Sequence, residues 1–388
     1  MARVERSDTR PRLLECRWHD RHGAPPLRAA SPPSTRAGAL PCPVAPVIST
    51  VLIVKLAAIG DIVMALPMVS ALRAASPAVR ITWLVGETAA PLLRCVDGID
   101  ETISIDETAL LSRNRRAQMR AVVGAWRKLG RRRFDQVLIA HADPRYRLLS
   151  RWLRADETRW LGERNGRPNF VGFRQHGDEY VRLVTALDDF SARRFAPPTV
   201  HTTLDADIAT RLQALAGRRL IAIAPGGARN PARDNPLRRW PLARYAELAR
   251  ALLSRGDAVL LTGGTDDAWT RDAFAGLAIT DLIGVTTVPG LVALYARCAG
   301  VVTHDSGPLH LARLAGTRVV GLFGPTPPAS FIREDSRTAA IWQADGLACA
   351  PCYDGREFAR CADNRCMQLI APKTALARLD ALLATTPA

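Results

Sequence analysis

Short apolar runs alternate with amphipathic stretches over most of the chain, and the alternation comes in two series. The first series begins at residues 51–54 and the second at 219–224, and in both the apolar run leads into a loop and then into helical spacing. Strands that alternate with helices pair in parallel and are covered on both faces, so the pattern predicts an α/β protein with two doubly wound domains. Ligands of such sheets bind beyond the carboxyl ends of the strands, and we therefore expect the site in a cleft between the domains.

The chain has 388 residues, which suits two or three domains. Residues 1–47 are rich in Arg, Pro, Ser and Ala without a period, so we expect a disordered tail that buries too little surface to offset the entropy of ordering. The polar, proline-containing stretch at 190–207 suits a linker. The predicted divisions are a tail at 1–47, an N-terminal domain at 48–195, a C-terminal domain at 205–370 and a last helix at 371–388.

The hydrophobic spacing also predicts the individual elements. In the N-terminal domain we predict strands at 51–54, 80–85, 101–105 and 134–140, and helices at 61–74, 89–96 and 178–187. Pro67 lies inside the first helix and should kink it. Residues 152–173 show no regular pattern. In the C-terminal domain we predict strands at 219–224, 258–262, 279–283, 301–302 and 319–323, and helices at 240–254, 288–298, 308–316 and 372–383.

Arginine gives the chain a formal net charge of +16. This excess favours contact with polyanions, whether nucleic acid, an anionic membrane face or phosphorylated substrates. The run at 113–133 has nine basic and no acidic residues, and its apolar residues recur at helical spacing, at Met119, Val122, Val123, Trp126 and Leu129. Two interpretations of this amphipathic helix stay open: it lies on an anionic membrane surface, or it presents a solvated arginine face over an ordinary core stripe.

The sequence has no apolar window that suits a membrane-spanning helix, because the best one, at 51–72, is interrupted by Lys55 and Asp61. The first residues lack the apolar segment of a secretory signal. We therefore expect a cytoplasmic protein, with the basic helix as a possible point of peripheral contact with the inner membrane.

Asp61 is the first candidate catalytic residue, because it opens a predicted helix at the carboxyl end of the first strand. A carboxylate in that place can take a proton from an acceptor hydroxyl as a general base, and the helix dipole favours its ionised form. A helix-capping aspartate would occupy the same position, so both interpretations stay open here.

The stretch at 300–312, GVVTHDSGPLHLA, predicts a strand, a turn and a helix that opens with Pro308. Unpaired backbone N–H groups and the dipole make such a helix start an anion site, and a diphosphate would suit it. Asp305 and Ser306 could instead be simple caps. The other candidates for donor binding are the arginine pair before the next helix, two glycine loops and a carboxylate for ribose hydroxyls: Arg238, Arg239, Gly226, Gly227, Gly263, Gly264 and either Asp266 or Asp267.

Four of the eight cysteines fall within eighteen residues, at Cys349, Cys352, Cys361 and Cys366. In a cytoplasmic protein this density is compatible with a structural metal, although the spacing is not that of a standard zinc ribbon. Free or redox-active thiols are the alternative.

Three blocks of sequence stand out by their order and spacing. They are VLIVKLAAIGDIVMALP at 51–67, PGG at 225–227 followed by RRWP at 238–241, and the long stretch from LIGVTTVPG to VVGLFGPTPP at 282–328. Together they resemble glycosyltransferase family 9, the lipopolysaccharide heptosyltransferases and related enzymes. The resemblance covers the chain from about residue 51 to its end.

The resemblance implies a GT-B fold, with two Rossmann-like domains that bind acceptor and nucleotide-sugar on opposite sides of a cleft. It implies inverting transfer of heptose from ADP-heptose to an anionic glycolipid of the lipopolysaccharide core, at the inner face of the cytoplasmic membrane and without a required cofactor. Asp61 matches the family's proposed base, and Arg238 stands where the heptosyltransferases have a phosphate-binding lysine. The donor motif Asp-Thr/Ser-Gly-x-x-His is matched by Asp305, Ser306, Gly307 and His310.

Two other classes of function can be weighed against transfer. A nucleic-acid-binding protein would explain the positive charge, but the basic run lacks interleaved aromatic residues and a reading motif, so we expect no nucleic-acid partner. A dinucleotide-dependent oxidoreductase is disfavoured because no G-x-G-x-x-G follows the first strand. A family 9 transferase with a different donor remains an alternative.

Overall fold

The structure is a computed structural model that describes residues 48–164, 167–168, 175–186, 195–230, 233–353 and 358–385. The predicted tail at 1–47 lies outside the described residues, as does the part of the predicted linker at 190–194.

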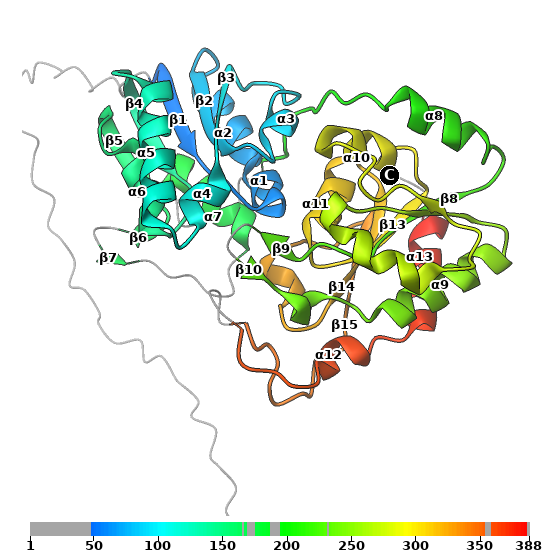
Figure 1. Cartoon of the computed structure of the whole chain (residues 1–388). Coiled ribbons are helices and arrows are strands. Elements are labelled where there is room, and N and C mark those ends of the chain that lie inside the picture. The colour runs from blue at the N-terminus through cyan, green and yellow to red at the C-terminus, as the bar shows by residue number, and fades with distance from the viewer. Residues whose placement is uncertain are drawn as a thin grey trace, which may run out of the picture. The chain divides into compact units, whose positions relative to one another are not determined.

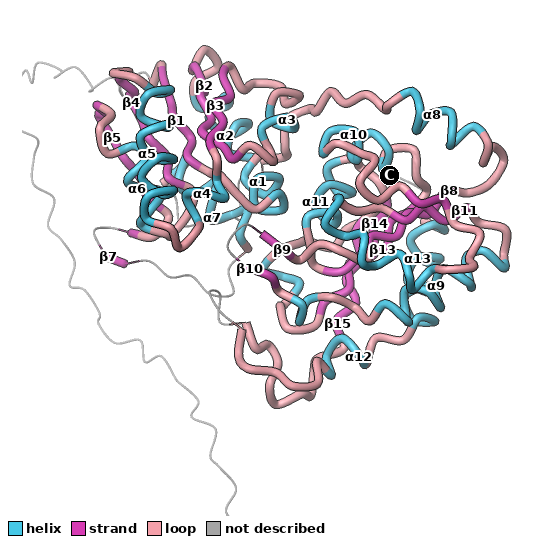
Figure 2. The backbone as a smooth tube through the Cα atoms, viewed as in Figure 1, coloured by secondary structure: helices cyan, strands magenta, loops and turns pink. Residues whose placement is uncertain are grey.

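Two parallel sheets organise the described chain (Figures 1 and 2). The first has five strands in the order β3-β2-β1-β4-β5, and the second has six in the order β12-β11-β8-β13-β14-β15. In both sheets the order reverses beside the first strand, which opens a crevice at the carboxyl ends where ligands of doubly wound folds bind. The predicted α/β class with two Rossmann-like sheets is confirmed. We call the two halves the first and second lobes.

The first lobe is built from residues 48–186. Its strands are β1 (Thr50–Val54), β2 (Arg80–Gly86), β3 (Glu101–Ile105), β4 (Arg133–Ile139), β5 (Arg154–Trp160), β6 (Glu163–Arg164) and β7 (Arg167–Pro168). Its helices are α1 (Ile59–Ala65), α2 (Pro67–Ala75), α3 (Ala90–Leu93), α4 (Glu107–Leu111), α5 (Arg115–Leu129), α6 (Pro144–Ser150) and α7 (His176–Thr185).

Strand β1 shows why this sheet is covered on both faces. Its side chains alternate, so that Val51 and Ile53 join one core cluster, with α1, α2, α3 and α7, while Leu52 and Val54 join another, with α5 and α6. All four side chains are fully buried. The continuous apolar run is therefore that of a central parallel strand.

Pro67 divides the predicted helix at 61–74 into two helices instead of kinking one. Helix α1 ends at Ala65, and Pro67 takes the first position of α2. Proline lacks a backbone N–H, which the first turn of a helix does not use, so it favours a new start over an interior position.

Strand β5 was not predicted, because its sequence RADETRW is mostly polar and its two apolar residues, Ala155 and Trp160, stand five apart. It pairs with β4 at the edge of the first sheet, and most of its residues are at least partly exposed. An edge strand needs few apolar side chains, so hydrophobic spacing gives little signal for it. The prediction of irregular structure at 152–173 is wrong for this part.

The second lobe is built from residues 206–385. Its strands are β8 (Leu220–Ala224), β9 (Arg229–Asn230), β10 (Arg233–Asp234), β11 (Ala258–Leu261), β12 (Thr280–Asp281), β13 (Gly300–His304), β14 (Arg318–Phe323) and β15 (Thr338–Trp342). Its α-helices are α8 (Ala206–Gln213), α9 (Leu242–Ser254), α10 (Val288–Tyr295), α11 (Gly307–Leu314), α12 (Arg365–Gln368) and α13 (Pro372–Ala384), and its 3₁₀ helices are η1 (Pro236–Arg238), η2 (Thr265–Phe274) and η3 (Pro328–Ser330).

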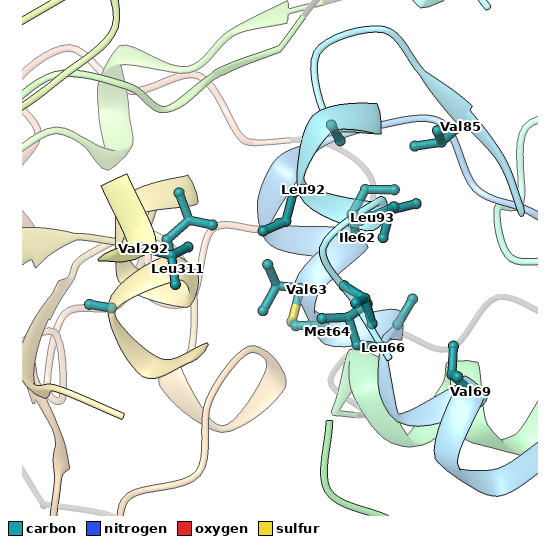
Figure 3. Close-up of a cluster of buried hydrophobic side chains, with 14 of the residues drawn as sticks. Ile62, Val63, Met64, Leu66, Val69, Val85, Leu92, Leu93, Val292 and Leu311 are labelled. Carbon is teal, nitrogen blue, oxygen red and sulfur yellow. The ribbon is translucent and has the colours of Figure 1, made fainter. Parts of the chain in front are cut away.

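An apolar contact joins the two lobes (Figure 3). Val63 and Leu92 of the first lobe lie in the same core cluster as Val292 and Leu311 of the second, and all four are buried. Each Å² of apolar surface that such a contact removes from water contributes roughly 25 cal/mol to the free energy of folding. Helices α1 and α11 therefore meet along a packed seam, and the cleft opens beside it.

Helix α5 confirms the predicted basic helix, but its inward face matches the predicted stripe only at Val122 and Leu129. Ala121, Val122, Ala125 and Leu129 face the core, whereas Met119 is 59% exposed. The small side chains of Ala121 and Ala125 let the helix lie close to the sheet. The prediction missed them because it considered only the larger apolar residues. No helix in the described part of the chain is long and apolar enough to cross a bilayer.

Candidate active site

A cleft lies between the lobes at the carboxyl ends of both sheets. Residues of the first lobe line one side, and residues of the second lobe line the other. The lining consists of Ala58, Gly60, Asp61, Met64 and His176, and of Ala228, Arg229, Arg233, Asn235, Arg238, Ser306, Gly307, His310, Thr326, Phe331, Tyr353 and Phe358. Of the residues predicted for donor binding, Gly226, Gly227, Arg239, Gly263, Gly264, Asp266 and Asp305 do not line it.

Asp61 is held by a lysine that comes from the strand before it. Lys55 directly follows β1 and is 1% exposed, and its Nζ donates to Asp61 Oδ2 at 2.9 Å. The lysine also lies 5.1 Å from the ring centroid of Tyr180. Asp61 occupies the third position of α1, and the N-cap is Ala58, so the capping alternative for Asp61 is wrong. About a quarter of its side chain, 27%, remains exposed to the cleft.

The charge around Asp61 keeps its carboxyl ionised. Burial by itself would raise its pKa, but Lys55 and, less strongly, His176 outweigh that effect and lower the pKa to about 2. Burial lowers the pKa of Lys55, and Asp61 opposes this shift. The predicted helix dipole is thus not needed, because a neighbouring cation accounts for the ionised form.

Three histidines surround this carboxylate in their neutral form at pH 7. Burial lowers the pKa of His141 to about 3 and that of His310 to about 4, and it also lowers the pKa of His176. His176 and His310 line the cleft. Neutral imidazoles leave Asp61 as the ionised group best placed to accept a proton on this side.

Asp305 is enclosed in the second lobe and does not reach the cleft. Its side chain is 1% exposed, its Oδ1 lies 2.6 Å from Arg238 Nη2, and its Oδ2 accepts from Thr326 Oγ1 at 2.7 Å. Burial would raise its pKa, but Arg238 outweighs this and lowers it. Arg238 itself lines the cleft and is 20% exposed. Asp305 therefore fixes the guanidinium and cannot itself touch a ligand in this geometry.

Helix α11 points its first turn at the cleft. Ser306 is the N-cap residue but its hydroxyl donates to His304 O at 3.1 Å, so it does not cap the helix. In this first turn Pro308 has no N–H and the Leu309 N–H donates to Ser306 O at 3.1 Å, so the Gly307 N–H and the positive end of the helix dipole are what α11 offers to an anion. This arrangement confirms the predicted geometry of an open helix start beside Gly307.

Gly60 allows the two lobes to approach at this point. A Cβ atom added to Gly60 would lie 2.6 Å from His310 Cδ2, which is closer than any packed contact. Gly60 belongs to the block at 51–67 and His310 to the block at 282–328. The first block therefore needs a glycine at this position, because the His310 imidazole packs against it between α1 and α11.

Asp267 joins the two glycine loops of the second lobe. Its Oδ1 accepts from the Gly227 N–H at 2.8 Å and its Oδ2 accepts from the Gly264 N–H at 2.8 Å. This carboxylate holds the loops together. Asp266, the other candidate for ribose hydroxyls, has a side chain that is 78% exposed.

Arg239 supports the loop behind the cleft. Its Nε donates to Gly227 O at 2.9 Å, and its guanidinium forms an ion pair with Asp234 and lies 5.3 Å from the ring centroid of Trp269. The two neighbouring arginines thus differ: Arg238 faces the cleft, and Arg239 braces a glycine loop.

Sequence reasoning missed several cleft residues. Phe331, Tyr353 and Phe358 form an aromatic wall, with ring centroids 6.1 Å apart for the first two and 4.9 Å apart for the last two. They come from loops that carry no periodic signal.

The pairing of Lys55 with Asp61 could have been predicted from the sequence. Lys55 directly follows an apolar strand, and a lysine that is buried there needs a charged partner.

The four clustered cysteines are free thiols. Cys349 and Cys361 are exposed, and Cys366 is buried beside Gly324. Among the described residues, which omit 354–357, no group of three or more His, Cys, Asp or Glu side chains is arranged to hold a metal. The geometry thus gives no support to the predicted structural metal.

These features define a GT-B protein, with two Rossmann-like lobes and a cleft that combines an ionised carboxylate with an arginine and an open helix start. The Escherichia coli ADP-heptose LPS heptosyltransferase II has the same fold, with a TM-score of 0.62 and 20% identity over 86% of this chain and 98% of that one. Residues 178–363 match the sequence model of glycosyltransferase family 9 (heptosyltransferase). The part of the chain that this model matches belongs to glycosyltransferase family 9.

Two relatives show how far the sequence similarity extends. Lipooligosaccharide heptosyltransferase 2 of Haemophilus influenzae is 35% identical over 123 residues, which cover 30% of this chain and 34% of the relative. The lipopolysaccharide core heptosyltransferase OpsX of the same organism is 25% identical over 281 residues, which cover 70% and 78%. The chain thus spans about a third of the length of the more identical relative.

Proposed function

We propose that this chain is an inverting glycosyltransferase that moves heptose from ADP-heptose onto a lipopolysaccharide core-type acceptor. The observation that carries the proposal is the cleft itself. Asp61 reaches it from the first lobe, and Arg238 and the start of α11 reach it from the second. A proton acceptor thus faces a group of positive ends across a space open to ligands.

Asp61 acts as the general base. Its carboxylate accepts the proton of the acceptor hydroxyl while that oxygen attacks the anomeric carbon of the donor sugar. The bond from this carbon to the diphosphate breaks, and the nucleoside diphosphate leaves with the electron pair. A positioned base of this kind contributes about 10²–10⁴-fold to the rate.

The second lobe stabilises the leaving diphosphate. Its negative charge grows as the bond breaks, so fixed positive groups bind the transition state more strongly than the ground state. Arg238, oriented by Asp305, and the Gly307 N–H at the start of α11 supply that charge. The proposed mechanism requires no bound cofactor.

The donor and the acceptor are inferred from different features. The structurally similar E. coli protein is an ADP-heptose transferase, and the aromatic wall of Phe331, Tyr353 and Phe358 suits a planar base. The same wall would accept another base, so a different nucleotide-sugar is the alternative. The two H. influenzae relatives are heptosyltransferases of lipooligosaccharide and of the lipopolysaccharide core, which favours an anionic glycolipid of that class as the acceptor.

We place the reaction in the cytoplasm, at the inner face of the cytoplasmic membrane, where a lipid-anchored acceptor would be presented. The protein would attach peripherally, and nucleic acid would not be a partner. A structural metal at Cys349, Cys352, Cys361 and Cys366 stays a prediction, which elemental analysis of the purified chain against a variant with all four changed to serine would test.

Release of nucleoside diphosphate tests the proposal directly. The full chain would be incubated with a heptose-deficient core glycolipid and, separately, with ADP-heptose, UDP-glucose and GDP-mannose. We expect acceptor-dependent release with ADP-heptose, and loss of release in Asp61→Asn. Release with only another donor would correct the donor, and no release with any donor would overturn the proposed activity.

A further inference from the structure

Helices α5 and α6 of the first lobe carry an exposed apolar cluster. Met119 is 59% exposed, Leu148 41% and Trp152 71%, which makes them three of the largest exposed apolar side chains in the described chain. Trp126 joins α5 to the other two residues, because its ring meets that of Trp152 edge to face with centroids 5.4 Å apart and its Nε1 donates to Leu148 O at 2.9 Å. Met119 lies two turns before Trp126 on the same edge of α5. Large apolar side chains that gather on a surface mark a contact with another body.

Helix geometry places a row of arginines beside this cluster. At 100° per residue, Met119 and Trp126 fall on one edge of the solvent-facing side of α5, and Arg116, Arg120 and Arg127 fall together next to them. All three arginines are exposed, and none forms an ion pair with a described residue. Helix α5 contains no acidic residue.

The surface joins two features that separately have ordinary explanations. A solvated arginine face needs no tryptophan at its edge. Met, Trp and Arg are also enriched in protein interfaces, so the choice of a bilayer rests on the row of arginines in a helix without an acidic residue. Tryptophan beside arginine is instead the composition that lies at the boundary of an anionic bilayer, where the ring enters the headgroup region and the guanidinium binds lipid phosphate.

The placement of α5 agrees with this occupant. The helix connects β3, through α4, to β4, so in a parallel sheet it begins at the edge where the strands have their carboxyl ends (Figure 1). The cleft opens at that same edge. Met119 therefore lies toward the end of the lobe where an acceptor would enter.

We propose that the surface formed by Met119, Trp126, Leu148 and Trp152 with Arg116, Arg120 and Arg127 docks the protein on an anionic phospholipid bilayer. The proposal deepens the proposed function, since it names the face that meets the membrane. Membrane binding can be measured without turnover, so the docking surface can be tested independently of the transferase activity.

Flotation of the full chain with lipid vesicles tests the docking surface. Wild type would be mixed with phosphatidylcholine vesicles that contain phosphatidylglycerol, and with vesicles of phosphatidylcholine alone, at physiological salt. We expect flotation with the anionic vesicles only. Arg116→Gln/Arg120→Gln/Arg127→Gln should weaken it by on the order of a hundredfold, since each arginine near an anionic surface contributes about fivefold. Met119→Ser/Trp152→Ser should weaken it by on the order of tenfold.

Matched controls come from the second lobe. Arg250 and Arg297 are exposed, and Leu369 is 48% exposed, so Arg250→Gln/Arg297→Gln removes two charges of the same kind and Leu369→Ser removes one exposed apolar side chain elsewhere. These variants should float as wild type does. All variants should keep wild-type melting temperatures and equal release of nucleoside diphosphate with a short-chain, water-soluble acceptor.

Several results would overturn the proposal. They are absence of wild-type flotation with anionic vesicles, equal loss in the control variants, and a dimer in light scattering that Met119→Ser/Trp152→Ser converts to a monomer, which would assign the face to self-association. Retention of RNA that competes with the vesicles through the same arginines would assign the face to nucleic acid. Flotation without any transferase activity would leave the docking surface intact and remove only the proposed function.

Discussion

Each lobe contains an aspartate paired with a basic side chain beyond the carboxyl end of a strand, β1 in the first lobe and β13 in the second, yet the two pairs differ in access to solvent. Asp61 lies 2.9 Å from Lys55 and keeps 27% of its side chain exposed, whereas Asp305 lies 2.6 Å from Arg238 and is 1% exposed. In the first lobe the cation is buried and the carboxylate faces the cleft. In the second lobe the carboxylate is buried and the cation faces the cleft.

The inversion explains how one repeated fold can supply two opposite functions. The buried member of each pair fixes the charge and orientation of the member that a ligand can touch. In the proposed reaction, a carboxylate would thus face the acceptor and a guanidinium the donor phosphates. Arginine suits the second place because its planar fork can hold Asp305 with one nitrogen while the rest of the group meets a phosphate.

The largest effect is expected for Asp61→Asn, which removes the proton acceptor without changing its size. Acceptor-dependent turnover should fall by about 10²–10⁴-fold. Binding of the donor nucleotide, measured by calorimetry, should change little because Arg238 is untouched. Turnover near the wild-type level would show that Asp61 is not the base, so the Lys55–Asp61 pair would no longer be the counterpart of the Arg238–Asp305 pair.

The next effect concerns Arg238→Met, which leaves the Asp305 carboxylate buried without its cation. Breaking a buried pair in this way typically costs about 3–5 kcal/mol of unfolding free energy. Urea denaturation would measure it, with Arg250→Met as a control at an exposed arginine that should change the stability by less than about 0.5 kcal/mol. Equal stability of the two variants would mean that Asp305 does not depend on Arg238.

A smaller loss is expected for Gly60→Ala, because the added methyl group would lie 2.6 Å from His310 Cδ2 at the seam between the lobes. Overpacking of this kind costs about 1–3 kcal/mol. The control is Gly124→Ala in α5, where a Cβ meets nothing within 4 Å and should stabilise the helix by up to about 1 kcal/mol. The melting temperature should fall for Gly60→Ala and rise for Gly124→Ala. A shift in the same direction for both variants would contradict the proposed clash at Gly60.

The smallest effect at neutral pH is expected for Lys55→Met. Lys55 holds the pKa of Asp61 at about 2 against the effect of burial, so its removal should raise that pKa. The ionised carboxylate is the active form, and the acid limb of kcat/KM should therefore move to higher pH, by about one unit or more.

Profiles of kcat/KM against pH for wild type, Lys55→Met and Lys55→Arg would show this shift. Lys55→Arg retains the charge and should keep most of the wild-type profile. An unchanged acid limb in Lys55→Met would show that the lysine does not set the protonation of Asp61.

Much of the framework could be predicted from the residues. The apolar runs at β1, β2, β8 and β14 are central strands, and buried parallel strands have a strong and local signature. Strand β5 and the short helix α6 were missed because their sequences are polar or lack a sufficient period. Asp61, Arg238, Ser306, Gly307 and His310 were predicted for the site from their motifs and line one cleft, although their roles stay predictions.

The sequence by itself determined that strands and helices alternate, that two such series exist, and that carboxylates, arginines and glycines stand at the ends of strands. These are properties of neighbouring residues, and the chain displays them directly. Only the tertiary structure decided which partner each charge has and which member of each pair is exposed. Lys55 with Asp61 and Arg238 with Asp305 look alike as residue types, and it is the packing around them, by excluding water from one member, that makes one pair present a base and the other present a cation.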